Sequence, residues 1–129
     1  MVLDTSALLA LLLNEPEADA FRVAVEEDLT RLVSAATLLE AALVIEARKG
    51  EAGGRELDLL IQKAEIQVVP MDEEHVAEAR RAYRRYGRGR HAAGLNYGDV
   101  FAYALARTTG EPLLFKGDDF ARTDVRRVL

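Results

Sequence analysis

The sequence predicts an α/β fold in which a mainly parallel central sheet is flanked by helices. Short apolar runs such as "MVLD", "TRLVS" and "PLLFK" have the length and composition of buried strands. They alternate with longer segments whose apolar residues recur at helical spacing. Since strands that alternate with helices are typical of parallel sheets covered on both faces, we expect a single α/β domain over residues 1–129.

The first half of the chain is predicted to contain two strands and three helices. "MVLD" is the first strand, and Thr5 or Ser6 caps a helix over "ALLALLL" that Pro16 interrupts. A second helix is expected in "EADAFRVAVEED" and a second strand in "TRLVS". Ser34 then caps a helix in "SAATLLEAALVIEARKG", for which Gly50 supplies the left-handed residue at the C-terminal end.

The second half continues the alternation of helices and strands. Gly53 and Gly54 are expected to break the chain before "RELDLLIQKA", and "IQVVP" is a third strand that Pro70 stops. Asp72 caps the next helix, which leads into the loop "GRGRHAAGLNYG". The helix "DVFAYALARTTG" ends at Gly110 and "PLLFK" is a strand. "GDDFARTD" is a loop or turn, and "VRRVL" is a possible last strand.

The composition excludes several classes of protein. The chain has 129 residues, 50% of them hydrophobic, which is enough for one packed core. It has no cysteine, which rules out a disulfide framework, a thiolate zinc site and a cysteine nucleophile. The apolar run from Leu8 to Leu13 is too short to span a membrane, and no basic segment precedes it. We therefore expect a cytoplasmic protein without a membrane partner.

The charge is unevenly distributed. A net charge of −5 argues against a protein that coats nucleic acid through bulk charge. One strip, "RRAYRRYGRGRH", nevertheless contains arginines and a histidine and no acid. Its helical part is typical of a solvated face, whereas Arg88, Arg90 and His91 lie in the loop that precedes Asp99 and are candidates to hold RNA phosphates.

Acidic residues occur where a ligand site would form. Asp4 ends the first strand, and Asp118 and Asp119 follow "PLLFK", so these carboxylates open onto the same edge of a parallel sheet, where ligands bind. Glu40 has apolar neighbours at helical spacing and is expected to point toward packing. Asp99 begins a helix, where the backbone dipole favours negative charge.

If these acids meet, their repulsion requires cations or protons between them. Oxygen ligands without cysteine or histidine favour Mg²⁺ or Mn²⁺ over zinc. A hard cation held by a few carboxylates, with positions open to water and phosphate, is suited to phosphodiester hydrolysis. The acidic pattern therefore favours a metal-dependent nuclease.

Four segments together resemble a known family. "VLDTSALLALLLNEPEA", "TLLEAALV", "LNYGDVFAYALA" and "PLLFKGDDFARTDV" are similar to PIN-domain ribonucleases, and most to the VapC-type toxins of VapBC toxin–antitoxin systems. The resemblance covers nearly the whole chain. It implies a PIN-like three-layer sandwich, with a mainly parallel central sheet of four or five strands flanked by helices. It also implies a Mg²⁺-dependent endoribonuclease, a homodimer, and inhibition by a cognate VapB-like antitoxin that docks on a hydrophobic groove.

The resemblance also implies roles for individual acids. Asp4 and Asp99 correspond to the principal Mg²⁺ ligands, Glu40 to a further acidic member, and the "GDDF" segment to the last. Asp118 is the expected ligand in that segment, and Asp119 is a further catalytic candidate.

The "GDDF" segment departs from the family pattern. Many relatives carry an acid where this chain has Gly117, so the sequence leaves open which of the two adjacent aspartates faces the metal. Thr5 and Ser6 match the hydroxyls that follow the first acid in the family and are candidates to position water or phosphate.

Each acid also has a purely structural explanation. Asp4 is a good helix cap, and Asn96 with Asp99 could form a capping box. Glu40 could pair with an arginine, and the paired aspartates after "PLLFK" could be turn formers. A coincidence is much less expected to place all four acids in the order that the family has.

Two other functions remain open at this stage. A non-catalytic PIN-like module that binds RNA or a partner is the main alternative. A receiver-type signalling domain is weaker, because it gives Glu40 no role. The aromatic residues Tyr97, Phe101, Tyr103 and Phe115 are expected in the core, and "ALLALLL" either packs internally or helps to form a homodimer face.

Overall fold

A computed structural model describes residues 1–129 and shows a four-stranded parallel sheet in the order β3-β2-β1-β4. The predicted α/β class is confirmed. The strands are β1 (Val2–Leu3), β2 (Leu32–Ser34), β3 (Gln67–Val69) and β4 (Leu113–Leu114). The helices are α1 (Thr5–Leu12), α2 (Ala18–Glu27), α3 (Ala35–Lys63), α4 (Glu73–Tyr86) and α5 (Asp99–Thr109), with a 3₁₀ turn η1 (Phe120–Arg122).

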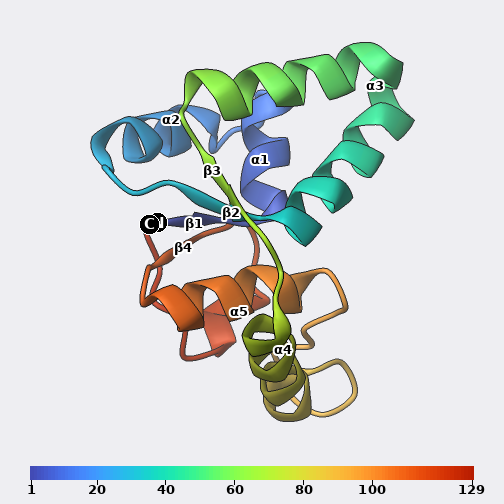
Figure 1. The fold of residues 1–129 in the computed structure, drawn as a ribbon, viewed down its shortest axis with the longest axis vertical. Helices are drawn as coiled ribbons and strands as arrows, with labels where there is room; N and C mark the ends of the chain where they lie inside the picture. Colours follow the sequence, from blue (N-terminus) through green and yellow to red (C-terminus); the bar gives the residue numbers. More distant parts are fainter.

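The elements form three layers. Figure 1 shows α1, α2 and α3 on one side of the sheet and α4 and α5 on the other. Each face of the sheet has its own core because side chains alternate along a strand. Val2 and Leu113 pack with α4 and α5, whereas Leu3 and Leu114 pack with α1 and α3. Strands β1, β2 and β4 are thus buried on both faces, whereas the edge strand β3 is largely exposed.

Helix α1 belongs to the core. Leu8 is fully buried and Leu11 nearly so, in the cluster that α1 shares with α2 and α3. Of the two alternatives that the sequence left open for "ALLALLL", internal packing is the one observed.

Helix α3 differs from the prediction. Gly50 has a positive φ of 65°, as expected, but the chain resumes the helix after it instead of ending there. Gly53 and Gly54, which we expected to break the chain, lie inside the second half of α3. Gly53 is buried, and a Cβ there would lie 2.8 Å from the Ile45 carbonyl oxygen. The glycine at position 53 therefore permits close packing of the two halves across the kink.

The helix caps were predicted in most cases. Ser34 and Asp72 cap α3 and α4, and Gly110 is left-handed after α5. The cap of α1 is Asp4, however, and not Thr5 or Ser6. The segment "VRRVL" pairs only at Arg127, which bridges to Leu113, so it does not form a fifth strand. No helix of the structure combines the length and the apolar character needed to cross a bilayer.

Candidate active site

Asp4 lies at the carboxyl end of β1 and is only 4% exposed. Its Oδ2 accepts hydrogen bonds from the Ser6 backbone N–H at 3.0 Å and from Ser6 Oγ at 2.7 Å. Ser6 Oγ in turn accepts from the Lys116 backbone N–H at 2.9 Å, just after β4. Burial raises the pKa of Asp4 to about 6, although the bonds from Ser6 act in the opposite direction. The end of β4 thus helps to fix the first acid.

Glu40 reaches the same region from α3. Thr5 Oγ1 donates a hydrogen bond to Glu40 Oε1, and the charge of Glu40 contributes to the raised pKa of Asp4. The buried face of α3 is formed instead by Thr37, Ala41 and Ile45. Glu40 is half-buried: its carboxylate lies against Thr5 and Gly98, so it faces neighbouring elements as expected, but at the border of a groove and outside the buried core.

Asp99 begins α5 and has two roles at once. Its backbone N–H donates to Asn96 Oδ1 at 3.0 Å, and its Oδ2 accepts from the Asn96 N–H at 2.9 Å. This is the capping box proposed as its structural explanation. Partial burial, together with the charges of Asp119 and Glu40, raises the pKa of Asp99 to about 6. The cap and the acidic cluster therefore share one carboxylate.

In the segment after β4, the aspartate that influences Asp99 is not the one that we expected. Asp118 and Asp119 are both exposed at the start of η1. Asp119 is the one whose charge raises the pKa of Asp99. The structure thus favours Asp119, where the sequence favoured Asp118.

The acids of the site influence one another through their charges. No three carboxylate or imidazole side chains lie in an arrangement that would hold a metal ion. Three of the acids instead accept hydrogen bonds from the protein itself: Asp4 from Ser6, Glu40 from Thr5 and Asp99 from Asn96. Ser6 has its hydroxyl engaged as both donor and acceptor, which makes it a support for Asp4.

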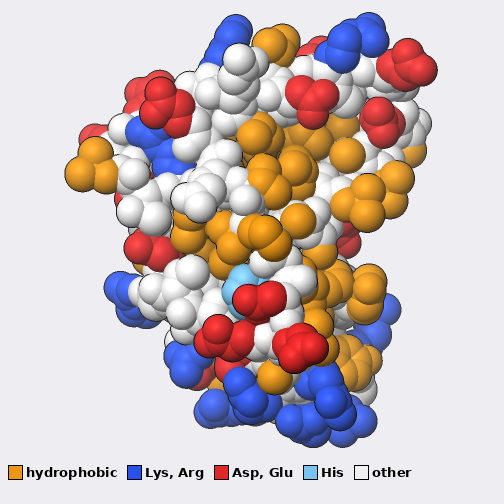
Figure 2. Space-filling view, viewed as in Figure 1, with side chains coloured by type: hydrophobic (Ala, Val, Ile, Leu, Met, Phe, Trp, Pro, Cys, Tyr) orange, Lys and Arg blue, Asp and Glu red, His pale blue; other side chains and the backbone are white.

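The basic loop borders the acids. Arg88 and Arg90 are exposed, and the charge of Arg88 lowers the pKa of Asp99. His91 is exposed, but its Nδ1 accepts from the Ala93 N–H at 3.0 Å and its ring packs edge-on against Tyr86. Figure 2 shows Lys and Arg side chains gathered over the α4 end of the molecule.

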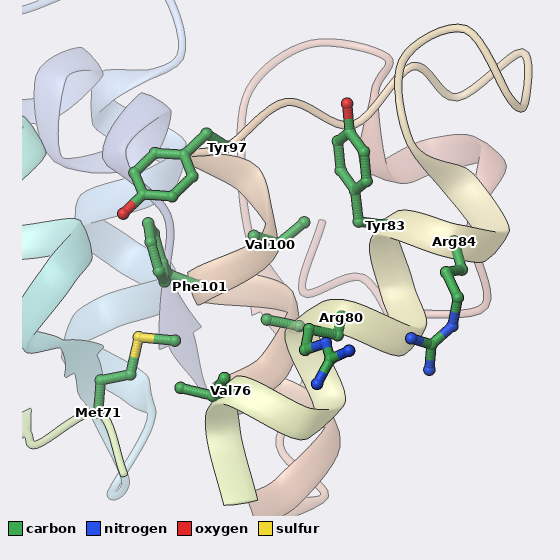
Figure 3. A pocket seen from close by; sticks show the side chains of 9 residues that line it. Met71, Val76, Arg80, Tyr83, Arg84, Tyr97, Val100 and Phe101 are labelled. Carbon is green, nitrogen blue, oxygen red and sulfur yellow. The ribbon is translucent and has the colours of Figure 1, made fainter. Parts of the chain in front are cut away.

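An apolar groove of about 570 Å³ runs between α4 and α5 (Figure 3). Tyr97 and Phe101 meet edge-to-face across 4.8 Å at one side, and Tyr83 lies at the other. A smaller groove shares Tyr97 and Phe101 and extends to Leu43 and Glu40. Tyr97 is 79% exposed, so its predicted place in the core is wrong. Phe101 is only half-buried and belongs to neither core cluster, so its predicted place in the core is wrong as well. Tyr103 and Phe115 are in the core, as predicted.

Comparison with known proteins gives the family. A profile of the PIN domain matches residues 1–126. The chain belongs to the PIN-domain family. Ribonuclease VapC30 of Mycobacterium tuberculosis is 58% identical to this PIN domain over 128 residues, which is 99% of this chain and 98% of the relative. This membership excludes the receiver alternative.

Solved structures agree on the fold. The crystal structure of VapC20 from Mycobacterium tuberculosis, described as a sarcin–ricin loop cleaving toxin, superposes on this PIN domain with a TM-score of 0.78 at 15% identity. The match covers 96% of this chain and 95% of VapC20. VapBC2 from Rickettsia felis gives 0.76 at 12% identity, covering 98% and 94%. The PIN-like three-layer sandwich expected from the sequence is confirmed.

Proposed function

We propose that this PIN domain is a metal-dependent endoribonuclease and the toxin of a VapBC toxin–antitoxin pair. The observation that carries the proposal is the placement of Asp4, Glu40 and Asp99 at one edge of the sheet, in a chain 58% identical to a named VapC ribonuclease. The substrate is RNA, and the bond hydrolysed is a phosphodiester. A cytoplasmic location follows from that substrate and partner.

The carboxylates of the site are chemically suited to bind a hard divalent cation. Asp4, Glu40, Asp99 and Asp119 offer only oxygen atoms, which suits Mg²⁺ or Mn²⁺. The raised pKa values of Asp4 and Asp99 express a cost of burying negative charge that a cation would offset. We propose Asp4 and Asp99 as the principal ligands, with Glu40 and Asp119 as further members. A bound divalent ion would supply Lewis-acid activation of water and stabilisation of the leaving oxygen.

The remaining residues of the site either hold the acids in place or bind the substrate. Ser6 and the Lys116 N–H fix the rotamer of Asp4, and Thr5 fixes that of Glu40. Arg88 lies close enough to Asp99 to lower its pKa, so a phosphate bound there would lie beside the acids. We propose that Arg88 and Arg90 bind RNA phosphates at the border of the site. His91 stabilises the loop that carries them through its contacts with Ala93 and Tyr86.

RNA cleavage with matched variants tests this function. Purified protein is incubated with total cellular RNA and Mg²⁺ or Mn²⁺, with EDTA, Asp4→Asn and Asp99→Asn as inactive controls. Asp58→Asn, an exposed carboxylate on α3, is the matched active control. Discrete products from the wild type and Asp58→Asn alone support the proposal. Cleavage that persists in both site variants or in EDTA contradicts it.

A second function is favoured by one observation, namely that no three acids are arranged to hold a metal. A PIN-like module that binds RNA without cutting it would match that geometry. Calorimetric titration with Mn²⁺ separates the two. Binding that disappears in Asp4→Asn supports the nuclease, whereas a folded protein that binds RNA but no Mn²⁺ supports the binding module.

We propose a homodimer formed through the apolar grooves beside the site. Leu43 and Tyr97 are 62% and 79% exposed, and contiguous apolar surface of this kind marks interfaces. The surface is acidic at Glu40 and basic at Arg80, so two copies related by a twofold axis are complementary in charge. Sedimentation should show a dimer that Leu43→Glu dissociates. Leu29→Glu, at a fully exposed loop residue, should leave the dimer intact.

We propose that a VapB-like antitoxin inhibits the protein. A separate groove of about 290 Å³ lies between α1, α2 and the second half of α3 and includes Leu11, Val25 and Leu60. Arg22 and Lys63 border it, which favours an apolar segment with acidic flanks. A cognate VapB-like antitoxin should co-purify with the wild type and suppress RNA cleavage. A Leu60→Arg variant that stays fully inhibited would contradict this docking groove.

A further inference from the structure

Gly98 lies directly beneath the carboxylate of Glu40. A Cβ built on Gly98 would be 2.7 Å from Glu40 Cδ and 2.9 Å from Oε1, closer than any real contact of this kind. Gly98 is buried and directly precedes α5 as its N-terminal flanking residue, whereas Glu40 belongs to α3. A side chain at position 98 therefore requires the carboxylate of Glu40 to move.

The backbone gives no reason for glycine at this position. Gly98 has φ −68° and ψ −37°, ordinary right-handed helical angles that any residue adopts. The hydrogen bonds of the cap are supplied by the Asn96 and Asp99 side chains, so the cap does not require glycine at position 98. Alanine is ordinarily the better helix former. The absence of a side chain is therefore explained by the space that Glu40 occupies.

We propose that Gly98 is a positioning residue: its lack of a side chain admits the carboxylate of Glu40 to the first turn of α5, beside Asp99. A methyl group there would displace the carboxylate, and Glu40 borders a groove into which its side chain can move. Leaving the site breaks the hydrogen bond that Glu40 receives from Thr5. The consequence for metal binding and catalysis rests on the proposed function, but the placement of Glu40 does not.

Gly54 offers a matched control on α3. A Cβ there would lie 3.1 Å from Glu46 Cδ, so Gly54→Ala also pushes a methyl group against a glutamate. Glu46 is exposed and can swing into solvent without losing a partner. Gly54→Ala should therefore leave RNA cleavage and Mn²⁺ affinity unchanged.

A double-mutant cycle on melting temperature tests the placement alone. In metal-free buffer, Gly98→Ala should raise the Tm by about 2–4 °C in a Glu40→Ala background, where the methyl group has room. In the presence of Glu40 the same change should give a smaller rise or a fall. Equal changes in the two backgrounds would overturn the proposal, because they would show that Gly98 and Glu40 do not interact.

Mn²⁺ titration and RNA cleavage test the consequence. Gly98→Ala should weaken Mn²⁺ binding and reduce the cleavage rate about tenfold or more, as Glu40→Ala does, and the double variant should lose no further activity. Glu40→Asp, which is one methylene shorter, should restore part of the Mn²⁺ affinity to Gly98→Ala. Normal Mn²⁺ affinity in Gly98→Ala, with weak binding in Glu40→Ala, would contradict the proposal. Normal binding in both variants, with the Tm coupling present, would instead reject the metal role of Glu40 and leave the positioning by Gly98 standing.

Discussion

Asp4→Asn should stabilise the metal-free protein at neutral pH. Burial raises the pKa of Asp4 from 3.8 to about 6, so the folded state holds its proton more tightly than the unfolded state does. As the pH rises through this interval, the unfolded chain ionises first and the folded state is penalised. The penalty is about 3 kcal/mol at pH 7.5 and about 1 kcal/mol at pH 4.5. Asparagine removes the charge but keeps an oxygen for the Ser6 N–H, and it is as good a helix cap.

Thermal unfolding in EDTA measures this effect. For a chain of this size, about 3 kcal/mol corresponds to a rise in Tm of about 10 °C at pH 7.5, and the rise should shrink to about a third at pH 4.5. Adding Mn²⁺ should then stabilise the wild type more than Asp4→Asn, because the bound cation offsets the buried negative charge of Asp4, which the variant lacks. Asp58→Asn, which removes an exposed carboxylate, serves as the control for a change in net charge alone.

The reasoning fails if Asp4→Asn lowers the Tm at pH 7.5. That result would mean that the hydrogen bonds from Ser6 to a charged Asp4 outweigh its burial, so that the residue is a structural cap. A rise in Tm of equal size at pH 7.5 and pH 4.5 would also contradict the reasoning, because the effect would not follow the ionisation of Asp4.

Three further predictions concern the basic loop and the core. Replacing Arg88 and Arg90 by Ala should weaken RNA binding and reduce the slope of log affinity against log salt by about 1.5–2; an unchanged slope would remove both from the interface. Tyr103→Phe removes a hydrogen bond of 2.5 Å to Asp124, so urea unfolding should show a loss of about 1 kcal/mol with cleavage unchanged; no loss would mean that the bond contributes nothing. Leu8→Ala should cost about 2–5 kcal/mol by the same assay, because Leu8 is fully buried; a cost below 1 kcal/mol would contradict its place in the core.

Much of the fold could be predicted because its signals are local. Strands β1, β2 and β4 are short runs of mostly apolar residues buried on both faces, as is typical of parallel strands, and Ser34, Asp72 and Gly110 mark helix ends by their own chemistry. The prediction failed where a distant contact decided the outcome. Gly53 reads as a helix breaker in isolation, yet it lies within α3 because its missing side chain lets the helix pack against the Ile45 turn.

The candidate site was predicted in kind but not in detail. The acids at strand and helix ends could be found by their positions in the sequence, and the family resemblance ordered them. Which of Asp118 and Asp119 approaches Asp99 could not be found, because adjacent residues in a turn point in different directions. Gly98 was missed altogether, since nothing in "NYGD" distinguishes a glycine that makes room from one that turns the chain.

The sequence by itself determined the α/β class, most of the helix caps and the identity of the acids, because these depend on residues within a few positions of one another. Only the tertiary structure decided that Glu40 lies on Gly98 and beside Asp99, across an interval of more than fifty residues. It also decided that Asp4 is buried while Asp118 is exposed. These outcomes depend on how α3 and α5 pack over the carboxyl edge of the sheet. Such packing is a sum over contacts between segments far apart in the chain, which no local pattern encodes.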